Sequence, residues 1–333
     1  MTEINVCPSS LAGGNDTYSK EALKSLFDGK RVSHIFNGVS PESDTIEIRE
    51  AIKTVGRISI SGVQPKFSAV IGEDNRLRYT KDKEQGTFIL KPKPTSRIII
   101  NREYWGANEN LTMQLASQVY DIETAPNGLC FFENDHSVAY ITRRFDVYDG
   151  GKYKQEDFAV LLGRNKDTHG EDYKYDNISY EECAEVIHKY VKPALVDIRK
   201  FFRIILFNFL TLNDDAHLKN FSLIEREGEF RLAPAYDLVN TSLMIREPRI
   251  FAFEKGLFKE GMNLTDTRWV NRNDFEEFGR RIGLPERLIK KELDFFIKTK
   301  PKAEKLIANS FLSDELKSQY WESYDYRRRM LTF

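Results

Sequence analysis

The sequence predicts an α+β fold of two lobes, in which a β-rich small lobe precedes a mostly helical large lobe. Three observations support this prediction. Residues 57–145 carry strand-like runs separated by turn-forming residues, which is typical of antiparallel strands. Residues 146–333 carry mainly helical spacing of apolar residues. A chain of 333 residues is also long enough for two lobes that each bury a core.

Residues 1–56 are predicted to form an N-terminal extension that packs on the small lobe, with helices at Lys20–Leu26 and Glu47–Thr54. The small lobe, residues 57–145, is expected to hold several strands and one helix. The strands are expected at Phe67–Ile71, Leu77–Thr80, Thr87–Lys91, Gly128–Phe132 and Val138–Arg144. The helix is expected over residues 102–120, where apolar side chains recur at helical spacing.

The large lobe, residues 146–333, is expected to contain several helices and one β-hairpin. Its helices are predicted from Ser179 to about Val191, from Pro193 toward Asn213, at Asp274–Ile282 and from Pro285 to about Lys298. The first of them begins with the capping-box pattern Ser179-x-x-Glu182. The hairpin is predicted from two strand-like segments, Phe221–Glu225 and Phe230–Ala233, on either side of a turn.

Composition argues against several classes of protein. Lysine plus arginine (50) nearly equals aspartate plus glutamate (51), so no overall charge favours nucleic acid or an anionic membrane. Cys7, Cys130 and Cys183 are far apart and odd in number, which argues against a disulfide framework or a zinc site. The sequence shows no signal-peptide pattern and no apolar run of the roughly 18 residues that span a bilayer. We therefore expect a cytoplasmic protein with no membrane partner and no direct nucleic-acid binding.

A cluster of polar residues follows the apolar helix that leads to Asn213. Asp215 precedes Asn220 by five residues, and Tyr236-Asp237 follows the predicted hairpin. The spacing Asp-x-x-x-x-Asn is found in the catalytic loops of protein kinases. Phosphoryl transfer needs a group that accepts or orients the incoming hydroxyl, and oxygen ligands that hold magnesium on the nucleotide phosphates. The pattern therefore predicts Asp215 as the proton acceptor.

The hairpin returns the chain to its starting point, so Asp237 is expected beside Asn220. Together they can hold Mg²⁺, a hard cation that prefers oxygen ligands and also binds substrate phosphates. Lys219 can approach the transferred phosphate, whereas His217 is interpreted as a brace of the loop. For the spacing alone, a solvated acidic turn is the alternative interpretation.

Two further elements fit a nucleotide site. The loop Ser59–Lys66 contains a small glycine turn whose backbone N–H groups can approach phosphates, although an ordinary turn is the alternative. Lys91 ends an apolar strand and is placed to reach nucleotide phosphates, with Glu109 of the following helix as its ion-pair partner. Taken alone, Lys91 is better interpreted as an edge lysine that extends to water. The chain then enters the large lobe through Arg143–Phe145, a hinge at the expected adenine edge.

Several motifs occur in the order in which one known family carries them. They are Ser-x-Ser-Gly-Val-Gln-x-Lys at 59–66, Phe-Ile-Leu-Lys-Pro at 88–92, Asn-Glu at 108–109, Arg-Arg-Phe-Asp at 143–146, Gln-Glu-Asp at 155–157, Asp-x-His-x-Lys-Asn at 215–220 and Tyr-Asp at 236–237. Together they resemble the HipA family of bacterial serine/threonine kinases, the toxins of toxin–antitoxin systems. The resemblance covers roughly residues 57–330 and implies a bilobal protein-kinase-like fold.

The resemblance implies an ATP-dependent kinase in which Asp215 accepts the proton and Asn220 and Asp237 hold Mg²⁺. It implies ATP contacts from Ser61, Gly62, Val63, Gln64, Pro65, Lys66, Lys91, Arg143, Arg144, Phe145, His217, Leu218, Lys219, Asn220, Tyr236 and Asp237. In this family the serine at the position of Ser59 can be autophosphorylated, so Ser59 and Ser61 are the expected sites of modification. A phosphate there would add negative charge where the ATP phosphates sit and would switch the kinase off. Two small turn-forming serines are the alternative.

About 56 residues precede the phosphate loop, whereas full-length HipA proteins carry an additional N-terminal subdomain of roughly a hundred residues. The chain therefore resembles the shorter HipT branch, in which a separate small protein supplies that subdomain. This similarity implies two partners, namely a small antitoxin protein and a helix-turn-helix DNA-binding protein. Relatives phosphorylate aminoacyl-tRNA synthetases and so halt translation, which implies a protein substrate of that kind.

Two other functions fit the same residues. The chain can be a catalytically silent kinase-fold module that binds a partner, although the residues needed for transfer are all present. It can also be a small-molecule kinase that shares the catalytic loop.

The polar segment Arg164–Asp176 can be a mobile loop beside the cleft or an ordinary surface loop.

Overall fold

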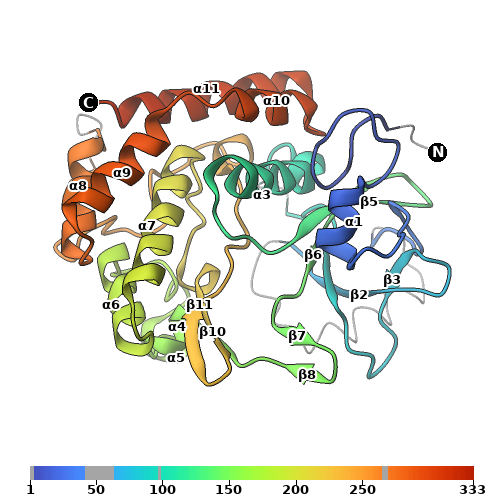
Figure 1. Cartoon of the computed structure of the whole chain (residues 1–333), viewed down its shortest axis with the longest axis horizontal. Coiled ribbons are helices and arrows are strands. Elements are labelled where there is room, and N and C mark those ends of the chain that lie inside the picture. The colour runs from blue at the N-terminus through green and yellow to red at the C-terminus, as the bar shows by residue number, and fades with distance from the viewer. Residues whose placement is uncertain (1–3, 42–63, 97–98, 265–268) are drawn as a thin grey trace.

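The computed structural model describes residues 4–41, 64–96, 99–264 and 269–333. A six-stranded sheet lies toward one end and a helical body toward the other, so the predicted α+β fold class is confirmed (Figure 1). Buried apolar side chains form two hydrophobic cores. The smaller core joins the sheet to the N-terminal segment, and the larger core joins helix α3 (Trp105–Tyr120) to the helical body.

The six-stranded sheet is mixed, with one parallel pair. In the order in which they pair, its strands are β1 (Ile35–Phe36), β5 (Asn127–Phe132), β6 (Val138–Arg143), β4 (Phe88–Lys91), β2 (Phe67–Ile71) and β3 (Leu77–Tyr79). The strands predicted for the small lobe are all present, each within one residue of its expected ends. Strand β4 pairs with both β2 and β6, and the register places Lys91 opposite Tyr140. A central strand therefore delivers Lys91 to the interior.

The N-terminal segment packs on the sheet through helix α1 (Lys20–Phe27) and strand β1. The hydroxyl of Tyr18 donates a 2.6 Å hydrogen bond to the carbonyl of Leu129 on β5. The sequence predicts α1 but misses β1, because a two-residue strand carries no measurable periodicity. The helix expected at Glu47–Thr54 lies outside the described residues.

Helix α3 is buried on nearly all sides, although many of its residues are polar. Asn108 and Asn240 exchange two hydrogen bonds of 2.8 and 3.1 Å, and the hydroxyls of Thr112 and Tyr320 lie 2.9 Å apart. A buried polar group left without a partner costs about 1–3 kcal/mol, so such pairs are what allow a polar helix to be buried. They fasten α3 to the segment that follows Asp237 and to helix α11 (Asp314–Met330).

The predicted hairpin follows a long apolar helix. In chain order the elements here are α7 (Leu195–Leu210), the 3-10 turn η2 (Leu218–Asn220), β10 (Ser222–Arg226) and β11 (Glu229–Leu232). A strand that the sequence did not predict, β9 (Gln155–Asp157), pairs with β10 as the third strand of this small sheet. Because β9 is only three residues long, its pattern is too short to identify. It brings Asp157 beside η2.

The remaining elements are several short connecting elements and the other helices of the helical body. They are η1 (Arg102–Tyr104), the ribbon β7 (Val147–Tyr148) and β8 (Gly151–Lys152), α4 (Phe158–Leu161), α5 (Lys166–His169), α6 (Tyr180–Tyr190), η3 (Thr241–Leu243), α8 (Arg272–Arg281), α9 (Glu286–Ile297), α10 (Pro301–Asn309) and α11. Helices α6, α8 and α9 are those predicted. Helices α10 and α11 lie along one side of the molecule (Figure 1), and Asn309 at the end of α10 donates a 3.0 Å hydrogen bond to the carbonyl of Leu11 in the N-terminal segment.

The cysteines take no part in disulfides. Cys7, Cys130 and Cys183 are all buried free thiols. Burial raises the pKa of the Cys130 and Cys183 thiols, so both stay protonated at neutral pH. In the part of the chain that the structure describes, no helix combines the length and apolar character needed to cross a membrane.

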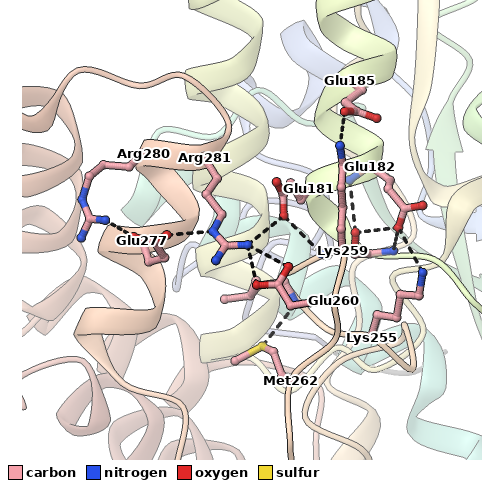
Figure 2. A network of polar contacts seen from close by, with 12 residues as sticks. Glu181, Glu182, Glu185, Lys255, Lys259, Glu260, Met262, Glu277, Arg280 and Arg281 are labelled. Atoms are coloured by element: carbon pink, nitrogen blue, oxygen red, sulfur yellow. Dashed lines mark hydrogen bonds and ion pairs between the residues drawn. The ribbon is translucent and has the colours of Figure 1, made fainter.

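A network of exposed ion pairs connects α6, α8 and the loop before α8 (Figure 2). Arg281 contacts Glu181 of α6, Glu260 of the loop and Glu277 of its own helix. Glu277 also pairs with Arg280. Exposed ion pairs contribute only about 0–1 kcal/mol each, so this network orients the loop more than it stabilises the fold.

A second group of ion pairs, in which one buried glutamate contacts two arginines, connects α7 to α9. Glu292 is 1% exposed and accepts hydrogen bonds from Arg199 (2.7 Å) and Arg203 (2.8 Å). Removing one member of a buried ion pair is costly, because the partner charge stays buried without compensation.

We predict that Glu292→Gln lowers the free energy of unfolding by about 3 kcal/mol, because Arg203, whose side chain is only 13% exposed, loses its counter-charge. Glu277→Gln is the matched control, since Glu277 also binds two arginines but its side chain is 36% exposed. Its expected loss is below about 1 kcal/mol. Urea denaturation of both variants measures the difference, and equal losses would contradict the prediction.

Candidate active site

A cavity of about 640 Å³ lies between the sheet and the helical body. Among the predicted site residues that the structure describes, all but Pro65 and Leu218 line it. The lining residues from this set are Gln64, Lys66, Lys91, Glu109, Arg143, Arg144, Phe145, Asp215, His217, Lys219, Asn220, Tyr236 and Asp237. Leu218 is instead buried in the larger hydrophobic core. The structure does not describe the predicted residues Ser59, Ser61, Gly62 and Val63.

The ammonium of Lys91 joins the elements that surround the cavity. Lys91 is 3% exposed, and its Nζ lies 2.6 Å from Oε1 of Glu109 on α3 and also contacts Oδ1 of Asp237 beyond β11. Burial alone disfavours the charged form, but the two carboxylates outweigh it and raise the pKa of Lys91. Lys91 is therefore a buried cation and not an edge lysine that extends to water.

Asp237 is the carboxylate on which two lysines converge. Lys66 Nζ, just before β2, lies 3.0 Å from its Oδ2, while Lys91 contacts its Oδ1. Burial raises the pKa of a carboxyl group, but the two lysines overcome this effect and hold the pKa of Asp237 well below its usual range. Burial raises the pKa of Glu109. Asp237 is thus the more strongly ionised of the two carboxylates at Lys91.

The backbone that leads to Asp237 is held in place by hydrogen bonds. Asp237 adopts a φ of 56°, in the left-handed region that aspartate tolerates better than most residues. Two residues earlier, Ala235 N donates to Glu123 O (2.8 Å) and Ala235 O accepts from Ala125 N (2.9 Å). These bonds anchor the chain before Asp237 to the segment that enters β5.

Asp215 lies in the loop between α7 and η2, and its side chain is 44% exposed. Its Oδ1 accepts a 2.6 Å hydrogen bond from the hydroxyl of Tyr175. Tyr175 belongs to the polar segment Arg164–Asp176, so this segment reaches the cavity and is not an unrelated surface loop. Tyr175 was not predicted as a site residue, because no spacing pattern connects it to a residue forty positions later.

His217 has the surroundings of a neutral brace. It is 8% exposed, and its ring packs edge-on against that of Tyr175, with centroids 4.9 Å apart. Burial lowers the pKa of His217 to about 4, against the opposing effect of Asp215. Its Nε2 lies 4.0 Å from Oδ1 of Asp215, which is too long for a hydrogen bond. This geometry supports the bracing role.

Lys219 is positioned by Asp157, to which the sequence analysis assigned no role. Its Nζ lies 3.3 Å from Oδ2 of Asp157, while Oδ1 of Asp157 accepts a 2.9 Å hydrogen bond from the backbone of Val160. Asp157 therefore caps α4 and also holds Lys219 at the cavity. The detectable signal was the motif Gln-Glu-Asp at 155–157, which β9 brings beside η2.

The hinge residues Arg143–Phe145 connect the sheet to the helical body. The side chain of Arg144 pairs with Asp146 at 3.0 Å. The rings of Phe145 and Tyr236 lie 5.7 Å apart at an angle of 32°. The hydroxyl of Tyr236 donates a 3.0 Å hydrogen bond to the carbonyl of Lys219. An aromatic pair thus lies beside the cationic part of the cavity.

The available oxygen donors fit a magnesium ion that binds together with a phosphate substrate. Asn220 and Asp237 both line the cavity, and Asp237 is kept ionised. Within the described ranges, no group of three or more His, Cys, Asp or Glu side chains could hold a metal by itself. Mg²⁺ usually takes one or two protein oxygens and completes its shell with substrate phosphates and water. Two donors are therefore sufficient.

Comparison with known proteins identifies the family. The model of the HipA-like C-terminal domain matches residues 58–303, and the chain belongs to this family. A Haemophilus influenzae protein named "Putative kinase" is 30% identical over 315 residues, which cover 89% of this chain and 87% of that protein. A Sinorhizobium fredii protein with the same name and the suffix Y4dM is 30% identical over 221 residues, which cover 61% and 49% of the two chains.

Two solved structures share the fold. HipA of Shewanella oneidensis MR-1, solved with HipB and operator DNA, has a TM-score of 0.61 at 19% identity, covering 89% of this chain and 74% of that one. CtkA, a proinflammatory kinase of Helicobacter pylori, has a TM-score of 0.51 at 14% identity, covering 91% and 95%. These similarities confirm the kinase-like fold that the sequence predicts.

We predict that the free energy of unfolding falls in acid because His217 binds a proton more readily in the unfolded chain. An unfolded histidine has a pKa of about 6.5, whereas that of folded His217 is about 4. Below pH 6.5, protons therefore bind preferentially to the unfolded chain. Stability is lost as the pH falls from 6.5 toward 4, by up to ~3 kcal/mol.

Urea denaturation between pH 4 and 7 tests this expectation. His217→Gln should show a shallower dependence of unfolding free energy on pH than the wild type. His169→Gln, at an exposed position on α5, is the control that should keep the wild-type slope. A His217→Gln protein with an unchanged slope would show that His217 is not the titrating group.

Proposed function

We propose that the protein is an ATP- and magnesium-dependent serine/threonine protein kinase. The observation that carries this proposal is the convergence of Asp215, Asp237 and the Lys91–Glu109 ion pair on one cavity. These residues come from four separate elements, and the fold brings them together. A module that only binds a partner would not need this set. The kinase names of the family relatives also support the proposal.

The size and lining of the cavity suit a nucleotide. Small-molecule sites commonly have volumes of about 300–1,000 Å³, and this cavity has about 640 Å³. Phe145 and Tyr236 offer apolar faces to the adenine ring, while Lys66 and Lys91 offer positive charge to the phosphates. Asn220 and Asp237 would hold Mg²⁺, which neutralises charge on the phosphates.

Asp215 would accept the proton of an incoming serine or threonine hydroxyl. The hydroxyl oxygen would form a bond to the γ-phosphorus of ATP while the bond from that phosphorus to ADP breaks. Negative charge on the transferring phosphoryl group would be balanced by lysines that the fold already holds in place. Lys219 is one such lysine, because Asp157 fixes it at the cavity.

We further propose that this kinase is a cytoplasmic toxin of a toxin–antitoxin system. The family membership supports this role, and the related HipA structure contains HipB and operator DNA. The proposed partners are a small antitoxin protein and a helix-turn-helix DNA-binding protein. The proposed substrate is a translation component such as an aminoacyl-tRNA synthetase, with autophosphorylation on Ser59 or Ser61 as regulation.

Phosphoproteomics after brief expression would identify the substrate, and a phosphorylated metabolite without a phosphoprotein would favour a small-molecule kinase.

Asp215→Asn and Asp237→Asn are each expected to reduce transfer of the γ-phosphate by at least about 10³-fold. The first change removes the proton acceptor, and the second removes the ionised magnesium ligand. Incorporation of label from γ-labelled ATP into the protein, including at Ser59 and Ser61, is the measurement. Asp167→Asn, on the exposed face of α5, is the control that should retain wild-type transfer. Full autophosphorylation by the Asp237→Asn protein would rule out the assignment.

A further inference from the structure

The segment between α4 and α6 delivers two side chains to the cavity that the proposed mechanism does not yet use. Lys174 and Tyr175 both line the cavity. The carbonyl of Lys174 accepts a 3.2 Å hydrogen bond from the backbone of Leu218 in η2. Arg164, near the start of the segment, donates a 2.6 Å hydrogen bond to the carbonyl of Asp176 near its end. The segment is therefore fastened to the loop that carries Asp215.

Tyr175 restrains a carboxylate that is otherwise free to rotate. The Asp215 side chain is 44% exposed, and within the described residues Tyr175 alone donates a side-chain hydrogen bond to its carboxylate. The bond is 2.6 Å long and occupies Oδ1. Burial and the nearby Asp215 raise the pKa of the Tyr175 phenol, so it keeps its proton and remains a donor. Oδ2 is left available for an incoming hydroxyl.

Lys174 differs from the other buried or half-buried lysines of the cavity. Lys66, Lys91 and Lys219 each pair with a carboxylate. Lys174 has no ion pair among the residues that the structure describes, and its Nζ lies 5.0 Å above the centre of the Tyr175 ring. Burial lowers the pKa of Lys174, and Lys66 and Lys219 act in the same direction against Asp215.

A half-buried ammonium beside other cations is stabilised by a bound anion. The proposed site holds the γ-phosphate of ATP next to Asp215, and Lys174 lines the same cavity. Preorganised positive charge at that position stabilises the charge that develops on the transferring group. The contact between Lys174 and the Tyr175 ring would keep this cation aligned with the Asp215 carboxylate.

We propose that Tyr175 is a positioning residue that orients Asp215, and that Lys174 is a further catalytic residue that binds the transferring phosphoryl group. The inference rests on the proposed kinase function and deepens it. The proton of the substrate hydroxyl passes to Oδ2 of Asp215, while the hydroxyl oxygen bonds to the γ-phosphorus and ADP departs. Tyr175 keeps its own proton throughout, and Lys174 binds the phosphoryl oxygens without forming a covalent bond.

The test for Tyr175 is the rate of autophosphorylation with γ-labelled ATP, followed over a range of ATP concentrations. Tyr175→Phe removes only the hydroxyl, and is expected to lower the maximal rate by about 10²-fold while leaving the ATP concentration at half-maximal rate unchanged. Tyr173→Phe is the matched control, because Tyr173 lies in the same segment but packs on the larger core outside the cavity. A Tyr175→Phe protein with an undiminished or higher maximal rate would overturn the assignment.

The test for Lys174 compares the binding of ATP and ADP by calorimetry, which does not depend on turnover. Lys174→Met is expected to weaken ATP binding by about tenfold and ADP binding by less than about twofold, since only ATP carries the γ-phosphate. Lys174→Arg should recover most of the preference for ATP. Lys166→Met is the control, because Lys166 lies in the same segment but pairs with Glu171 on the surface. Equal effects on ATP and ADP would overturn the Lys174 assignment.

The two assays also separate this inference from the proposed function. Wild-type protein that transfers no phosphate would overturn the kinase proposal, and the role of Tyr175 with it. If the wild type transfers phosphate and the Tyr175→Phe and Lys174→Met proteins transfer it equally fast, the kinase proposal stands and the inference alone is overturned.

Discussion

The structure depends on one buried cation, the ammonium of Lys91 held between Glu109 and Asp237. A buried lysine stays charged only when nearby carboxylates compensate its charge, and these two come from α3 and from the loop beyond β11. The same ion pairs therefore connect the central strand of the sheet, the buried helix α3 and the segment that carries Asp237, the proposed magnesium ligand. The ion pairs of Lys91 with Glu109 and Asp237 therefore both hold the fold together and set the charge of the cavity.

Local patterns, taken together with the order of the family motifs, predicted Lys91, Glu109 and Asp237 as residues of one site. The spacing of Asp215 and Asn220, the hairpin before Asp237 and the strand that ends at Lys91 are all readable over a few neighbouring residues. Tyr175, Asp157 and Lys174 were not predicted as site residues, because their roles arise from contacts that only the folded chain creates. Tyr175 meets Asp215 across forty positions, and Asp157 meets Lys219 because β9 pairs with β10. No sequence pattern records the contact of Tyr175 with Asp215, whereas the motif Gln-Glu-Asp at 155–157 was a signal for Asp157.

The helices and strands show the same limit, because only the longer ones have a pattern that can be identified. The longer strands and the helices α1, α3, α6, α7, α8 and α9 were predicted close to their ends, whereas α4, α5, α10 and α11 were not predicted. Strand β1, the ribbon β7–β8 and β9 were missed, since two or three residues define no period. Helix α3 shows a different limit, because its buried Asn108 and Thr112 look like surface residues until their partners Asn240 and Tyr320 are known.

The most direct test of the account is whether Asp237 exchanges its lysine partners for magnesium when nucleotide binds. The measurement is the dissociation constant of ATP with and without Mg²⁺, for the wild type and for Asp237→Asn. Coupling between two ligands at one site typically changes affinity by about 5- to 150-fold. The account predicts that Mg²⁺ tightens ATP binding to the wild type by about tenfold or more and has no such effect on the variant. An equal gain in both proteins would show that Asp237 does not hold the metal, and would contradict the account.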